Sequence, residues 1–204
     1  MTRRKRQTLR DKTARRQRAQ NLWLAGGAAL FVALIALVVY LNIRNQTPVG
    51  DEQAVPTLGN AHIQEGGVSP IAYNSTPPTS GPHYGGMAPW GIQRQPQRYE
   101  QLLHNLEDGG VAVYYQCAEE CPELERQLEE LLDPYARAQR RVLLLPNDPA
   151  WREPPGRGNS QPLHQEMGNR IALTAWQRID KFDEFDAERI RAFIERYEGI
   201  DHHR

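Results

Sequence analysis

The longest run of hydrophobic positions lies near the start of the chain, over residues 21–43. No charged residue interrupts it between Leu22 and Ile43, and about 20 apolar residues in a helix span the hydrocarbon core of a bilayer. Trp23 and Tyr40 lie near its two ends, where aromatic side chains favour the membrane interface. The run predicts a single transmembrane helix that holds the protein in a lipid bilayer.

A cleaved signal peptide is the alternative for a hydrophobic run in this position. Its apolar region usually has about 7–15 residues and is followed by small residues at a cleavage site. Here the run is longer and ends in Tyr40-Leu-Asn-Ile-Arg-Asn-Gln, without an Ala-x-Ala pattern. The sequence therefore favours an uncleaved anchor.

Basic residues gather in front of the anchor, over residues 1–20, where nine Lys and Arg side chains stand against the single acid Asp11. The positive-inside rule places this tail in the cytoplasm and everything after the anchor on the extracytoplasmic side of the membrane. The formal net charge of the chain is 0, so the part after the tail is acidic, with 24 Asp and Glu against 16 Lys and Arg. An acidic outer part argues against nucleic acid as a partner.

Beyond the anchor the pattern becomes that of a globular domain. Residues 44–60 are polar and contain Pro and Gly, which is typical of a linker. Residues 61–200 are numerous enough for one extracytoplasmic domain with a hydrophobic core. The stretch 62–98 is rich in Pro, Gly, Ser and Thr, and predicts a long irregular loop, a kind of segment that is often functional.

The remaining patterns predict an α+β domain with a small sheet. Apolar residues recur with the helical period over Tyr99–Glu107, and again after Pro122, which fits the first position of a helix. A third amphipathic helix begins after Asp186, its expected N-cap. Short apolar runs predict three buried strands, and the first two with their intervening helix form a βαβ unit with parallel strands. The strands are Val111–Gln116, Arg141–Pro146 and Arg170–Trp176.

The two cysteines, Cys117 and Cys121, lie between a predicted strand and a predicted helix. The helix N-terminus lowers the pKa of a thiol and favours the thiolate, which binds soft metals such as Cu(I). The same spacing of one helical turn allows a disulfide, and outside the membrane thiols commonly pair. Both interpretations stay open at this point.

Other metal-ligating side chains recur along the domain. His83 and Met87 share the Pro/Gly loop, and His104 lies on the first predicted helix of the domain. If they converge with the cysteines, the chain holds a copper site. The predicted ligands are His83, Met87, His104, Cys117 and Cys121, and His164, Met167, Glu107 and Asp108 are further candidates. His62 lies at the domain entrance, and His202 and His203 are expected in a frayed tail.

Several separated motifs resemble the bacterial DUF3105 family, a domain of unknown function that usually follows a single membrane anchor. They are Pro77-Pro-Thr-Ser-Gly-Pro-His-Tyr84, Ala88-Pro-Trp-Gly91, Leu103-His-Asn-Leu-Glu-Asp-Gly-Gly-Val111 and Ala172-Leu-Thr-Ala-Trp176. In that family a second His usually follows the His-Asn-Leu-Glu segment, where this chain has Asp108. If this position binds a metal, the resemblance therefore implies that a carboxylate oxygen of Asp108 takes the place of the histidine nitrogen found in the family.

Two functions follow from these patterns. The first is a membrane-anchored metal-binding protein, with copper as its cofactor, that serves as a chaperone or sensor. The second is a non-catalytic interaction module of a larger membrane protein complex, stabilised by a Cys117–Cys121 disulfide. The domain has no nucleophile elbow, phosphate loop or His-Glu-x-x-His motif, so an enzyme is the least favoured class.

Overall fold

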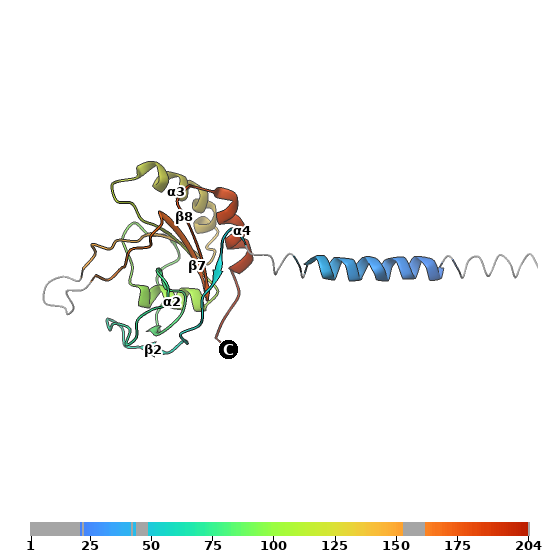
Figure 1. Cartoon of the computed structure of the whole chain (residues 1–204), viewed down its shortest axis with the longest axis horizontal. Helices are drawn as coiled ribbons and strands as arrows, with labels where there is room; N and C mark the ends of the chain where they lie inside the picture. Colours follow the sequence, from blue (N-terminus) through green and yellow to red (C-terminus); the bar gives the residue numbers. More distant parts are fainter. Residues whose placement is uncertain (1–20, 22, 42, 44–48, 153–161, 204) are drawn as a thin grey trace, which may run out of the picture. The chain divides into compact units, whose positions relative to one another are not determined.

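The structure is a computed structural model (Figure 1), and it describes residues 21, 23–41, 43, 49–152 and 162–203. Among these, one helix, Trp23–Leu41, is long and apolar enough to cross a membrane, with 19 residues and a mean hydropathy of 2.5. This agrees with the predicted anchor. The basic tail of residues 1–20 lies outside the described residues. The helix and the domain that follows belong to separate units, and each is described by itself.

The domain that follows is built on a mixed six-stranded sheet with the strand order β1-β8-β7-β5-β6-β4, and β2 and β3 form a separate pair. The fold class is α+β, as predicted. The strands are β1 (Gln53–Ala54), β2 (His62–Ile63), β3 (His83–Tyr84), β4 (Gly91–Ile92), β5 (Val111–Tyr115), β6 (Val142–Pro146), β7 (Ile171–Ala175) and β8 (Arg178–Phe182), and the helices are α2 (Tyr99–Glu107), α3 (Pro122–Arg137) and α4 (Ala187–Tyr197).

The centre of the sheet contains the predicted βαβ unit. Strands β5 and β6 pair in parallel, and α3 connects them. Strand β7 adds to the other side of β5 in antiparallel orientation. The three strands expected from apolar runs therefore lie side by side, as β7-β5-β6.

Strand β8 was not expected, because three of the five residues in its sequence Arg-Ile-Asp-Lys-Phe are charged. It pairs with β7 as a hairpin. Asp180 on β8 is 1% exposed, and its carboxylate accepts a hydrogen bond of 2.7 Å from Nε of Arg189 on α4. The ion pair with Arg189 allows the charged side chain of Asp180 in the sheet interior. The N-cap of α4, Asp186, was predicted correctly.

Alternate residues of the central strands pack into two cores. On one face, Val111, Val113 and their neighbours pack against α3 and α4. On the other face, Ala112 and Tyr114 pack against α2, together with Leu143 of β6. Figure 1 shows α3 and α4 on one side of the strands and α2 on the other. The second core fixes α2, whose last turn carries the candidate site.

Candidate metal site at the end of helix α2

Four side chains with metal-ligating atoms converge beside the last turn of α2. They are His62, His83, His104 and Glu107, and one ligand atom from each lies within 4.8 Å of the others. The ring centroids of the three histidines are 4.9 to 5.4 Å apart. His83 and Glu107 are buried, whereas the His62 side chain is 51% exposed. The cluster therefore has a buried floor and a side that faces solvent.

Backbone pairing places the first two histidines next to each other. Strands β2 and β3 run parallel, with His62 opposite His83, and the His83 amide donates to the Ala61 carbonyl at 3.0 Å. On α2, His104 and Glu107 are three residues apart, so they share one face of the helix. Secondary structure thus sets the positions of all four candidate ligands.

Asn105 fastens the loop after His83 to the same helix. Its Oδ1 accepts from the Ala88 amide at 2.8 Å, and its Nδ2 donates to the Ala88 carbonyl at 2.9 Å. Both contacts are buried, and buried hydrogen bonds of this kind resist separation because an unpaired partner is costly. The segment from His83 to Ala88 is therefore held against α2.

The hydrogen on Nδ1 of His83 can be assigned from its contacts. Its Nδ1 lies 2.8 Å from the Gly81 carbonyl oxygen, which only accepts hydrogen bonds, so Nδ1 carries the hydrogen. Its Nε2 lies 2.9 Å from Oε2 of Glu107. Burial lowers the pKa of His83, against the opposing effects of the Gly81 carbonyl and Glu107. When His83 is neutral, the lone pair of Nε2 points toward a carboxylate oxygen, and either a proton or a metal cation must lie between these two acceptors.

The carboxylate of Glu107 is held in place from the other side. Oε1 accepts a hydrogen bond of 2.8 Å from Nδ2 of Asn60. Oε2 is left facing imidazole nitrogens, with Nε2 of His62 at 3.8 Å and Nε2 of His83 at 2.9 Å. One oxygen is therefore a structural acceptor, and the other is oriented as a ligand atom.

His104 has one buried ring nitrogen without a hydrogen-bond partner among the described residues. Its Nδ1 is buried and makes no hydrogen bond with any residue that the structure describes. Buried polar atoms are nearly always paired, and exceptions call for an explanation such as an ion. Its Nε2 lies 3.9 Å from Oδ2 of Asp108. His104, Asp108 and His203 form a second group of converging ligand atoms next to the first.

The predicted cysteine ligands lie elsewhere. Cys117 and Cys121 form a disulfide, with their Cα atoms 6.2 Å apart, so their sulfurs are not available as thiolates in this structure. Cys117 follows the C-terminal end of β5, whereas Glu107 precedes the N-terminal end. A strand of five residues is about 17 Å long, which separates the disulfide from the histidine cluster.

Met87, which was also predicted as a ligand, is a surface residue with 44% exposure. Its carbonyl accepts a hydrogen bond from the Gln101 side chain at 3.2 Å. The further candidate Met167 is 2% exposed and packs in the core that α2 covers. Met87 is thus a surface residue of the loop, and Met167 is part of the core.

His164, a further candidate, is fully buried and has a structural role near the start of α2. Its Nδ1 accepts from the Asp148 amide at 3.1 Å, and its Nε2 donates to the Gln97 carbonyl at 2.7 Å. Its ring stacks on Tyr99, with centroids 4.4 Å apart. Burial lowers the pKa of His164 to about 4, so the ring is neutral, and both of its nitrogens are already used.

Sequence reasoning left two of the converging residues out of the predicted ligand set. His62 was placed only at the domain entrance, and His203 was expected in a frayed tail. In the structure the His202 amide donates to the Glu107 carbonyl at 2.9 Å, which brings His203 to the cluster. No periodic pattern marks either residue, because the pairing of β2 with β3 and the return of the chain to α2 are tertiary events.

The family model for proteins of unknown function named DUF3105 matches residues 62–203. The chain belongs to the DUF3105 family. The matched region includes all of the converging residues, from His62 to His203. Comparison with curated proteins gives no match, and comparison with solved structures gives none either.

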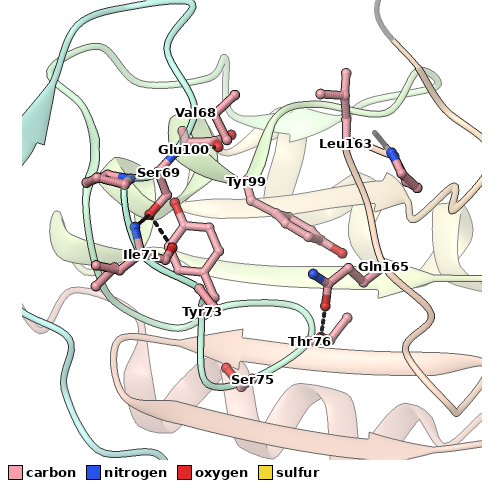
Figure 2. Close-up of a pocket in the computed structure, with 13 residues that line it drawn as sticks. Val68, Ser69, Ile71, Tyr73, Ser75, Thr76, Tyr99, Glu100, Leu163 and Gln165 are labelled. Atoms are coloured by element: carbon pink, nitrogen blue, oxygen red, sulfur yellow. Dashed lines mark hydrogen bonds between the residues drawn. The ribbon is translucent and has the colours of Figure 1, made fainter. Parts of the chain in front are cut away.

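The DUF3105 domain also has a cavity of about 330 Å³ at the start of α2, between Tyr73, Tyr99 and Gln165. Figure 2 shows these side chains around the cavity, with Thr76 donating to Gln165. The Tyr73 hydroxyl donates to the Pro82 carbonyl at 2.7 Å, and Glu100 accepts from the Ser69 amide. Its polar groups are paired within the protein, so the histidine cluster is the stronger candidate site.

Proposed function

We propose that this DUF3105 protein binds one divalent transition-metal ion, Zn²⁺ or Cu²⁺, through His62, His83, His104 and Glu107. One observation carries the proposal. His83 donates from Nδ1 to the Gly81 carbonyl, and its Nε2 lies 2.9 Å from a buried carboxylate oxygen of Glu107. Metal-binding histidines commonly donate their second nitrogen to a backbone carbonyl, which orients the ring and fixes its tautomer.

The donor set determines the class of metal. Three imidazoles and a carboxylate suit Zn²⁺ and Cu²⁺, whereas Cu(I) prefers thiolate and thioether ligands, and Mg²⁺ and Ca²⁺ prefer oxygen. The copper role expected from the sequence is therefore proposed in its Cu²⁺ form, without the two cysteines. The exposed edge of His62 gives an incoming or departing ion a route to solvent, which suits a metal chaperone or sensor.

The proposed location is the extracytoplasmic face of a bacterial cytoplasmic membrane, with residues 21–43 in the bilayer. The basic residues before the anchor support a cytoplasmic N-terminus. The Cys117–Cys121 disulfide supports an oxidising compartment for the domain. The metal site is thus proposed to act on metal outside the cytoplasm.

The test uses the full chain in detergent micelles, purified without chelators and analysed for bound zinc, copper, nickel and iron. Affinity is then measured by titrating Zn²⁺ and Cu²⁺ against a competing chelator. We expect one ion per chain. His62→Ala removes a half-exposed ligand without opening the core, and it should weaken binding by more than the roughly 10–100-fold that is typical for outer-shell residues.

The matched control is the double variant Cys117→Ser/Cys121→Ser, which tests the thiolate hypothesis directly. It should bind the metal with unchanged affinity, because the disulfide lies at the other end of β5. Loss of binding in this variant would contradict the histidine site. A wild-type chain that retains no metal would overturn the proposal and leave the alternative, an interaction module of a larger membrane complex stabilised by the disulfide.

A further inference from the structure

The segment that follows α4, Gly199–His203, is bound along the end of α2. The Gly199 amide donates to the Gly109 carbonyl at 2.7 Å, and the His202 amide donates to the Glu107 carbonyl at 2.9 Å. Figure 1 shows this end of the chain turning back toward α2 and β2. The main chain of the segment is therefore attached to the turn that carries the metal ligand Glu107.

Gly109 permits this close approach. Its φ is +79°, and a Cβ atom at this position would lie 2.8 Å from the amide nitrogen of Ile200. That distance is too short for a carbon atom against backbone, so any other residue would push the segment away from α2. The absence of a side chain at Gly109 keeps the segment beside the site.

His203 is held with one nitrogen toward the site. Its Nδ1 lies 2.9 Å from Oδ1 of Asp201 and 3.3 Å from Oδ1 of Asp108. Its Nε2 lies 3.6 Å from Oε2 of Glu107, the oxygen that His62 and His83 also face. A carboxylate on one nitrogen and a ligand position at the other is the usual arrangement of a metal-binding histidine.

We infer that His203 is a further ligand of the proposed metal ion, and that binding of the ion holds the segment Gly199–His203 more firmly against α2. The inference rests on the proposed function. His203 is 42% exposed, and its segment is joined to α2 through main-chain hydrogen bonds. Metal binding and segment docking therefore stabilise each other, since coupling between two binding events is reciprocal. Displacing the segment provides a route for releasing the metal.

The affinity test compares His203→Ala with His202→Ala in the full chain, with Zn²⁺ as the probe and a competing chelator. His202 is a matched control, because its ring stacks on Trp176, with centroids 6.2 Å apart. We expect His203→Ala to weaken Zn²⁺ binding by about 10-fold or more while the stoichiometry stays at one, and His202→Ala to change it less than about 3-fold.

Hydrogen exchange at the amides of Gly199 and His202 provides the second measurement. Zn²⁺ should slow exchange in the wild type and in His202→Ala, but not in His203→Ala. Equal Zn²⁺ affinity in His203→Ala and wild type, with binding still lost in His62→Ala, would overturn this inference and leave the proposed function intact.

Stoichiometry distinguishes a second possibility, in which His104, Asp108 and His203 hold an ion of their own. Two Zn²⁺ ions per wild-type chain, with only the weaker one lost in His203→Ala, would also overturn the inference. A wild-type chain that binds no Zn²⁺ or Cu²⁺ would instead refute the proposed function itself, so the two failures can be told apart.

Discussion

The two ends of helix α2 each hold a fully buried histidine, and their contacts differ. Near the start, His164 uses both nitrogens on backbone groups, Asp148 and Gln97. Near the end, His83 uses one nitrogen on a backbone carbonyl and turns the other toward Glu107. Burial lowers the pKa of both histidines. Burial therefore does not distinguish a structural histidine from a candidate ligand, and the difference between the two lies in the partner of the second nitrogen.

The largest expected effect on stability is at His164, the structural histidine in this comparison. Replacing His164 with Ala removes a buried ring and leaves two backbone groups without their partner. Loss of a buried aromatic side chain typically costs about 3–5 kcal/mol, so we expect the free energy of unfolding to fall by at least about 3 kcal/mol. Urea denaturation of the full chain in detergent measures it, with the exposed variant Met87→Ala as a control that changes little.

Zn²⁺ affinity of His164→Ala, measured where the protein is still folded, should equal that of the wild type. A large loss of affinity would show that His164 belongs to the metal site, and the distinction between the two ends of α2 would fail.

The second prediction separates a metal site from a structural ion pair at the other end of α2. In Glu107→Gln, the side-chain amide can donate to Nε2 of His83, while its oxygen can still accept from Asn60. The charge that attracts a metal is lost. We expect Zn²⁺ affinity to fall at least about 100-fold, which corresponds to about 2.7 kcal/mol, while the metal-free protein keeps its stability within about 1 kcal/mol.

A structural ion pair between a protonated His83 and Glu107 gives the opposite result. Removing one partner of a buried ion pair typically costs about 3–5 kcal/mol. Denaturation of Glu107→Gln in the presence of a chelator therefore decides the question: a loss of that size would show that a protonated His83 pairs with Glu107 and would contradict the proposed metal site.

The strands differ in how far they could be predicted from the sequence. Strands β5, β6 and β7 are continuous apolar runs, so they were predicted. Strand β8 was not, because its buried Asp180 depends on Arg189 from α4. Strands β2 and β3 have two residues each, too few for any periodic pattern.

The same reasoning applies to the candidate site. His83, His104 and Glu107 were among the predicted candidates, because His83 lies in the Pro/Gly loop and because His104 and Glu107 share one turn of a predicted helix. His62 and His203 were not in that set, since their positions depend on contacts with distant parts of the chain. Cys117 and Cys121 could be a thiolate pair or a disulfide by spacing alone, and only the three-dimensional structure places them away from the histidines.

The smallest predicted effect is a pH dependence of stability that arises at His164. Its pKa is lowered from 6.5 to about 4 in the folded protein because the ring is buried. Between these values the unfolded chain binds a proton that the folded protein does not, so stability falls as the pH decreases below about 6.5. From pH 7 to pH 5.5 this histidine should cost about 1 kcal/mol of stability.

His164→Gln does not titrate, so its stability should fall by about 1 kcal/mol less than that of the wild type over the same interval. The comparison is made by urea denaturation in the presence of a chelator, where the metal ligands contribute equally to both proteins. An equal acid-induced loss in both would mean that the His164 ring is not held neutral by its two backbone partners, and the contrast with His83 would lose its physical basis.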